Sequence, residues 1–117
     1  MVKGIFALFL ITASAISAQP KIESVFYHNG NALLDYCESE NATERVACMA
    51  YLAGTIDSTE AWVASNQLRR AICKPKPVTT KQLRKVFIEY ANTNPEGLHL
   101  AASSIAIAAF AEAFPCQ

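Results

Sequence analysis

Apolar residues recur at helical spacing in four segments of the chain, and the alternation that predicts strands is almost absent. The first expected helix follows the turn at Asn29-Gly30-Asn31 and ends near Cys37. The second runs from Thr43, its expected N-cap, to about Ala71. Asp57-Ser58-Thr59 is the weakest part of this long helix, where a kink forms most easily.

The third and fourth helices are bounded by prolines and capping residues. Residues 74–77 (KPKP) break the helical pattern, because proline clashes inside a helix. Thr79 and Gln82 then fit a capping box. The apolar residues that follow lie on one face of a helix: Leu83, Val86, Phe87, Tyr90 and Ala91. The last helix is expected over residues 95–114, with Asn94 as its cap.

The last expected helix is apolar enough to be compared with a membrane span. Its apolar run is interrupted by His99, Ser103, Ser104 and Glu112. Bulky residues are few and alanines fill most of its faces, as in a central helix that its neighbours approach closely. The pattern therefore predicts an all-α fold, a small bundle of four to five helices.

The first 18 residues have the layout of a secretory signal peptide. Lys3 is followed by a short apolar run, Ile5 to Thr12, and then by small residues up to Ala18. Cleavage is expected after Ala18, with Ala15 as a second site. A retained anchor is the alternative, but the apolar run is shorter than the roughly 20 residues that a membrane span needs. Residues 19–117 are then a single helical domain in the periplasm.

Size and charge restrict the remaining possibilities. A chain of 117 residues supports one domain. Ten Lys and Arg balance ten Asp and Glu, so the chain lacks the positive charge of a nucleic-acid-binding protein. A domain this small is marginally stable unless it is cross-linked.

Four cysteines in an exported chain predict two disulfide bonds, for which three pairings are possible. Cys37 ends the first helix and Cys48 lies early in the second, so these two can join a helical hairpin. Cys73 and Cys116 each follow a helix and can meet at one end of the bundle. The order of the helices therefore favours Cys37–Cys48 and Cys73–Cys116. Closing these loops contributes roughly 3 and 4 kcal/mol to stability.

Catalytic and metal-binding motifs are missing from the sequence. Neither His28 nor His99 has a metal-ligating partner three or four residues away. With all cysteines in disulfides, no thiol nucleophile remains. Glu38, Glu40 and Glu44 are interpreted as a solvated acidic loop. We expect no enzyme activity, no metal and no cofactor.

Several stretches resemble the Rap/Tai immunity proteins, which protect bacteria from type VI secretion amidases. Residues 48–57 (CMAYLAGTID) are similar to the family pattern C-x-G/A-Y-I/L-x-G-x-x-D. The resemblance continues from Cys73 to Val86 and from Tyr90 to Ala102, and it ends with Ala113-Phe114-Pro115-Cys116. It covers nearly the whole mature chain.

This resemblance implies an all-α, periplasmic and non-catalytic protein, in many members a homodimer, that binds a peptidoglycan amidase effector and blocks it. The positions that match are scaffold residues: the four cysteines, Gly54, Asp57, Pro95, His99 and Pro115. Gly54 would cost about 1 kcal/mol against alanine in mid-helix, so we expect close helix packing there. Contact loops vary between members, so no inhibitory residue is transferred.

Three segments are expected to be the most exposed, residues 38–43, 74–77 and 90–96, and one of them should contact the effector. Their candidate partner-binding residues are Glu38, Glu40, Asn41, Lys74, Lys76, Asn92 and Asn94. Trp62 is interpreted as a core residue more readily than as an exposed binding anchor. No nucleic acid is expected as a partner, and no membrane after signal cleavage.

A small periplasmic acid-stress chaperone of the HdeA type is the alternative function. Such chaperones are also helical and disulfide-linked, and they open at low pH. Dye binding and mass measurement near pH 3 discriminate between the two.

The first prediction concerns export. The periplasmic protein should begin at Gln19, because cleavage after Ala18 removes the apolar leader. N-terminal sequencing of the exported protein checks this. An intact Met1 in the membrane fraction would contradict it.

Overall fold

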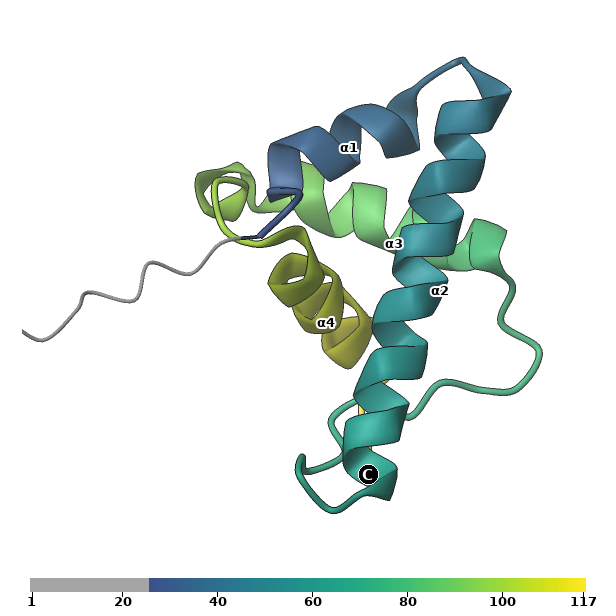
Figure 1. Ribbon diagram of the computed structural model, residues 1–117, viewed down its shortest axis with the longest axis vertical. Helices are drawn as coiled ribbons and strands as arrows, with labels where there is room; N and C mark the ends of the chain where they lie inside the picture. Colours follow the sequence, from purple (N-terminus) through teal and green to yellow (C-terminus); the bar gives the residue numbers. More distant parts are fainter. Residues whose placement is uncertain (1–25) are drawn as a thin grey trace, which may run out of the picture.

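The computed structural model describes residues 26–117, which form four α-helices and one 3-10 helix (Figure 1). These are α1 (Gly30–Glu38), α2 (Ala42–Ala64), α3 (Thr80–Thr93), η1 (Pro95–Gly97) and α4 (Ala102–Ala113). Strands are absent from residues 26–117, apart from one isolated bridge between Asn29 and Ala101. The all-α prediction is confirmed. The predicted signal peptide lies outside the described residues.

α2 is the longest helix and forms one side of the fold, with α1 and α3 crossing near one half of it and α4 beside its middle (Figure 1). Each of the four α-helices packs against the other three. The centre holds Phe87, Phe110, Leu33 and Leu52, all at most 2% exposed. The first turns of α4 face its neighbours through alanines, whose small side chains allow the close approach that the sequence predicts.

Asparagine side chains cap the first two helices. The Asn29 side chain accepts a hydrogen bond from the Ala32 amide at 2.9 Å. The Asn41 side chain accepts from the amides of Thr43 and Glu44, so α2 begins before the expected cap. The prediction of Thr43 as N-cap is wrong because asparagine, two residues earlier, is at least as good a cap.

α2 ends at Ala64, seven residues before the predicted end at Ala71. Asn66 adopts a left-handed conformation, with φ of 58°. The amides of Asn66 and Gln67 donate to the carbonyls of Val63 and Trp62, which is the Schellman pattern of a helix C-terminus. Asparagine tolerates this conformation better than most residues. α2 is one continuous helix across residues 57–59, so no kink forms there.

The predicted last helix, residues 95–114, is divided into η1 and α4. The backbone between η1 and α4 forms hydrogen bonds with residues 28–31, at the start of α1. The amides of Gly30 and Asn31 donate to the carbonyls of Leu100 and Leu98, and the Ala102 amide donates to the His28 carbonyl. These tertiary hydrogen bonds replace those of a continuous helix. Asn94 makes no side-chain cap, because its amide group donates to the Tyr90 carbonyl at the end of α3.

Both disulfides have the pairing that the order of the helices favours, Cys37–Cys48 and Cys73–Cys116. The first is fully buried and joins the end of α1 to the start of α2. The second is exposed and joins the segment after α2 to the residues after α4. Next to it the Cys73 amide donates to the Phe114 carbonyl at 2.8 Å. The first cross-link therefore lies at the start of α2, and the second lies in the segment that follows the end of α2.

Two glycines differ in how closely other parts of the fold approach them. A Cβ on Gly30 would collide with the Ile105 side chain and lie 2.9 Å from the Leu98 carbonyl oxygen. A Cβ on Gly54 would meet nothing within 4 Å, so the expected close helix packing at Gly54 is wrong. We predict that Gly30→Ala destabilises by about 2 kcal/mol through overpacking. Gly54→Ala should stabilise by about 1 kcal/mol through helix propensity.

Urea denaturation of the two glycine variants beside the parent checks this prediction. Gly54→Ala is the matched control, because it adds the same methyl group to a helix without a collision. Equal shifts of the unfolding midpoint would contradict the packing at Gly30.

A second stability prediction concerns the exposed disulfide. Cys73→Ala combined with Cys116→Ala should lower the free energy of unfolding by about 4 kcal/mol, because a loop of 43 residues is released in the unfolded chain. Both side chains are exposed, so little packing is lost with them. Calorimetric melting measures the loss, and an unchanged melting temperature would count against it.

Candidate functional site

The seven predicted partner-binding residues lie in two separate places. Glu38, Glu40 and Asn41 lie at the connection between α1 and α2, and Asn92 and Asn94 lie at the end of α3. The structure brings two of these segments together, because the Asn92 amide donates to the Glu38 carboxylate at 2.8 Å. The segment with Lys74 and Lys76 lies away from that connection, beside the other half of α2 (Figure 1).

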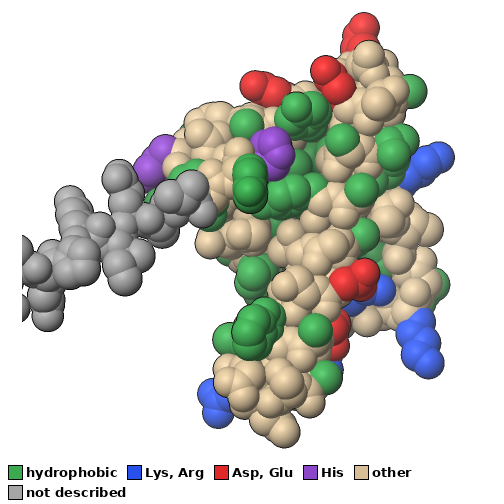
Figure 2. Space-filling model, in the orientation of Figure 1, with side chains coloured by type: hydrophobic (Ala, Val, Ile, Leu, Met, Phe, Trp, Pro, Cys, Tyr) green, Lys and Arg blue, Asp and Glu red, His purple; other side chains and the backbone are tan. Residues whose placement is uncertain are grey.

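The α1–α2 connection presents carboxylates in a fixed arrangement. Asp35, Glu38, Glu40 and Glu44, which we call the acidic corner, are all exposed. Figure 2 shows acidic side chains gathered at this end of the molecule. The Arg45 guanidinium donates to the backbone carbonyls of Ser39 and Glu40. Arg45, the only Lys or Arg between 26 and 68, thus holds the loop. All four acidic residues are exposed, and the Glu38 carboxylate also accepts from Asn92.

Two of the candidate residues have structural roles. Asn41 caps α2 with its side-chain oxygen, and Asn94 ends α3 by donating to the Tyr90 carbonyl. Their side chains are therefore engaged within the fold. Glu40, Lys76 and Asn92 are exposed, and Lys74 is half-buried with its ammonium group 3.4 Å from the Pro75 carbonyl.

The five scaffold positions implied by the resemblance are spread over the fold. Gly54 and Asp57 lie on the exposed side of α2, and Pro95 begins η1. His99 is exposed in the turn between η1 and α4, and Pro115 lies between α4 and the Cys116 disulfide. They do not converge on one site.

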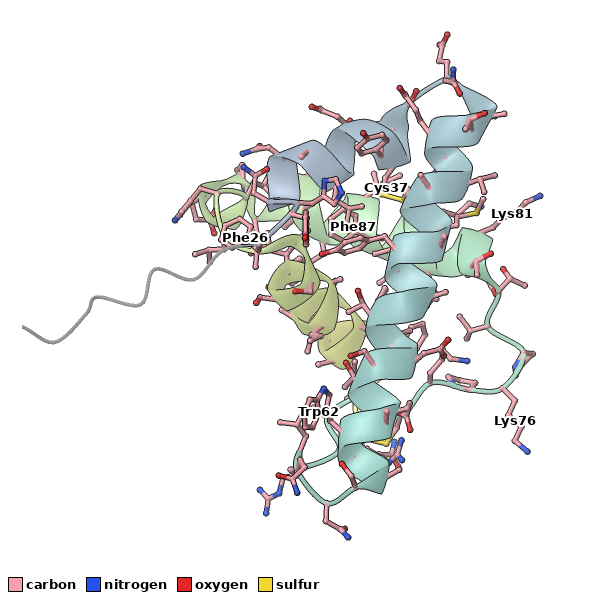
Figure 3. All side chains as sticks on the ribbon, viewed as in Figure 1. Phe26, Cys37, Trp62, Lys76, Lys81 and Phe87 are labelled. Atoms are coloured by element: carbon pink, nitrogen blue, oxygen red, sulfur yellow. A yellow bond between two sulfur atoms is a disulfide. The ribbon has the colours of Figure 1, made fainter. Side chains whose placement is uncertain are left out.

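Sequence reasoning missed a groove between α2 and α4. The cavity has a volume of about 560 Å³ and is bordered by Tyr51, Gly54, Trp62, Leu68 and Ile107, which define the Trp62 groove. Trp62 is 54% exposed and Leu68 is 50% exposed, so the interpretation of Trp62 as a core residue is wrong. Figure 3 shows Trp62 on the opposite side of α2 from Lys76 and Lys81.

One signal in the sequence indicates this groove. Small residues occur at every fourth position of α2, at Ala50, Gly54 and Ser58, and Trp62 continues the row. Residues four apart lie on one helix face, so three small side chains leave a hollow that ends at an indole ring. Exposed tryptophan beside a hollow is typical of binding hot spots.

Within residues 26–117 no three His, Cys, Asp or Glu side chains lie close enough to hold a metal ion. Every cysteine of the chain is in a disulfide. In the same part of the chain, no helix is long and apolar enough to cross a membrane.

Residues 29–116 match the family model of Rap1a immunity proteins. The chain belongs to this family. The matched residues run from the cap of α1 to the last cysteine, and they include every helix and both disulfides. A search of curated proteins and a search of solved structures each gave no match.

Membership in the Rap1a family makes the chain an immunity protein of a type VI secretion effector, and its task is to bind that cognate effector. The acidic corner, the Trp62 groove and the lysine segment all lie within the matched residues. These three surfaces are therefore the candidates for effector recognition.

Proposed function

We propose that this immunity protein binds and blocks a peptidoglycan amidase effector in the periplasm, protecting the producing cell and its siblings. The match to Rap1a immunity proteins over residues 29–116 carries the proposal. The same match favours immunity over an acid-stress chaperone. The amidase target is supported by the resemblance of residues 48–57 and the later motifs to the Rap/Tai proteins.

Two features support the periplasm as the compartment. Disulfides persist in oxidising compartments and are rare in the cytosol, and this chain joins all four of its cysteines. Residues 1–18 have the pattern of a signal peptide. An immunity protein that meets its effector outside the cytoplasm needs an export signal, and disulfides are stable where it acts.

The acidic corner is the surface best suited to an amidase cleft. Peptidoglycan stem peptides carry free carboxylates, so a cleft that binds them offers positive charge. Glu38 and Glu40 present carboxylates on a connection that Arg45 and Asn92 hold in place. A preorganised loop loses little entropy on binding, and opposite charges speed association. Occupying the cleft blocks the enzyme sterically and requires no chemistry from the inhibitor.

The Trp62 groove offers a second contact of a different kind. A half-exposed indole beside Leu68 and the open surface over Gly54 can receive an apolar side chain. This side chain would come from the effector or from a second copy of the chain, since the resemblance implies homodimers in many members. Mass measurements with and without the effector separate these two occupants.

The prediction is tested by co-expression with periplasmic amidases. The chain should restore growth of a host that exports its cognate amidase. Glu38→Lys with Glu40→Lys should weaken binding at least about tenfold, because two attractive contacts become repulsive. Glu89→Lys with Glu112→Lys is the matched control, since it makes the same charge change on exposed residues of α3 and α4.

Three outcomes separate the parts of this proposal. If the chain neutralises only an effector of another enzyme class, the amidase target is wrong. If both double variants bind like the parent while Trp62→Ala does not, the contact lies in the Trp62 groove. Protection by a chain without residues 1–18 would contradict the periplasmic compartment.

A further inference from the structure

Basic residues are confined to one stretch of the described chain. Residues 69–85 contain seven basic side chains and no acidic one, namely Arg69, Arg70, Lys74, Lys76, Lys81, Arg84 and Lys85. The rest of residues 26–117 contains nine acidic side chains and a single basic one, Arg45. A near-neutral protein is thus divided into an acidic part and a basic part.

Two of these basic residues are engaged by side-chain contacts with distant parts of the fold. Arg70 pairs with Glu60 at 2.6 Å, and Arg84 donates to the Cys37 carbonyl at 2.6 Å. Arg69 and four lysines make no salt bridge with any residue from 26 to 117. The four lysines, Lys74, Lys76, Lys81 and Lys85, are called the basic edge. Figure 3 shows Lys76 and Lys81 projecting into solvent from the same side of the molecule.

Two lysines of the basic edge lie near the start of α3, where positive charge lowers the stability of a helix. Lys81 lies in the first turn of the helix, where the positive end of the helix dipole repels a cation. Lys85 follows four residues later, and like charges at this spacing repel each other. The first turn holds no acidic residue to compensate. Helix stability therefore does not explain the charge of Lys81, whereas Lys85 also lies four residues before Glu89, a spacing that favours the helix.

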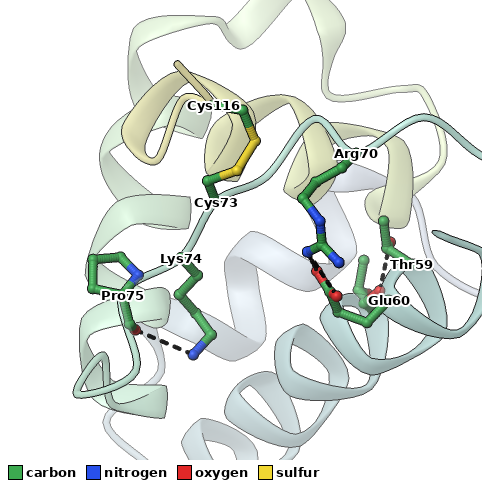
Figure 4. Close-up of polar contacts among 8 residues, drawn as sticks. Thr59, Glu60, Arg70, Cys73, Lys74, Pro75 and Cys116 are labelled. Atoms are coloured by element: carbon green, nitrogen blue, oxygen red, sulfur yellow. Dashed lines mark hydrogen bonds and ion pairs between the residues drawn. A yellow bond between two sulfur atoms is a disulfide. The ribbon is translucent and has the colours of Figure 1, made fainter. Parts of the chain in front are cut away.

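The loop that carries Lys74 and Lys76 is held at both ends. The Cys73–Cys116 disulfide fixes its start (Figure 4), and the capping box of Thr79 and Gln82 fixes its end. Pro75 and Pro77 restrict the backbone between them. A loop fixed in this way loses little conformational entropy when it binds.

The side chains of the basic edge fit a polyanion better than a tight protein interface. Cores of protein interfaces are depleted in lysine and enriched in aromatic residues and arginine. Residues 73–85 contain no aromatic residue, and Leu83 is buried. An amphipathic surface that enters a bilayer also needs exposed apolar side chains. Hydrated ammonium groups spaced along the loop and the start of α3 instead match repeated carboxylates on a polymer.

We propose that the basic edge binds the carboxylates of peptidoglycan and holds the immunity protein on the polymer that its effector attacks. This inference rests on the proposed function, which supplies the compartment and the polymer. The acidic corner is repelled by the same carboxylates. The acidic corner therefore makes no attractive contact with the polymer and stays available to the effector.

Co-sedimentation of the purified exported protein with isolated peptidoglycan sacculi tests this inference. The protein should pellet with sacculi at low ionic strength and be released by salt, because exposed charges are screened. Lys76→Gln with Lys81→Gln should weaken binding about fivefold. Asn31→Asp with Gln117→Glu gives the same change in net charge at other exposed positions and should bind within twofold of the parent.

Sacculi whose carboxyl groups have been converted to amides should no longer bind the protein. The inference is overturned if the protein fails to pellet with native sacculi, or if amidation leaves binding unchanged. Equal weakening by both double variants would overturn it too, because binding would then depend on the net charge of the protein and not on the position of the lysines. Stronger binding to phosphatidylglycerol vesicles than to sacculi would assign the basic edge to a membrane and would also overturn it.

The sacculus assay contains no effector, so its failure leaves the proposed inhibition of an amidase standing. Conversely, the co-expression assay can fail while sacculus binding persists.

Discussion

The pairing of residues 28–31 with residues 98–102 is the constraint on which the arrangement of the helices depends. Three backbone hydrogen bonds connect these segments, and Gly30 lies so close to Leu98 and Ile105 that no larger residue fits. This contact stops the helix that begins at Pro95 and starts α4 at Ala102. It also fixes the beginning of α1. At the other end of α1, the buried Cys37–Cys48 disulfide fixes where α2 begins.

The direction in which the α1–α2 hairpin runs determines where the acidic residues lie in the fold. The acidic corner forms at the tip of this hairpin, and Asn92 holds it against α3 through Glu38. The Cys73–Cys116 disulfide places the lysine loop at the opposite half of α2. The loop with Lys74 and Lys76 is thus separated from the acidic corner, whereas Arg84 of α3 reaches the Cys37 carbonyl beside that corner. One surface is suited to a basic cleft and another to an anionic polymer.

The Trp62 groove has a different origin. A row of small residues on α2 is left uncovered because α4 is short and packs beside only part of the long helix. Gly54 has open space above it, so its lack of a side chain serves no contact within the chain. In a protein whose task is to bind an effector, an uncovered hollow beside a half-exposed tryptophan is a surface available to a partner.

Local features of the sequence predicted most of the fold. Helical spacing of apolar residues predicted the all-α class, and the Thr79–Gln82 capping box predicted the start of α3. Prolines at 75 and 77 marked the break before it, and the order of the helices favoured the observed disulfides. Each of these features acts within a few residues or through chain order, so it can be recognised without the tertiary structure.

The errors arose where distant parts of the chain compete with local preference. Residues 98–101 have helix-forming side chains, but their backbone groups bond to the start of α1 instead. The sequence of α2 could not reveal whether Gly54 and Trp62 face a neighbour, because that depends on the length and position of α4. For the charged residues, the sequence by itself determined where they lie along the chain. Only the tertiary structure decided that Glu38 meets Asn92 while Lys74 and Lys76 lie elsewhere, since surface contacts follow from how whole helices pack.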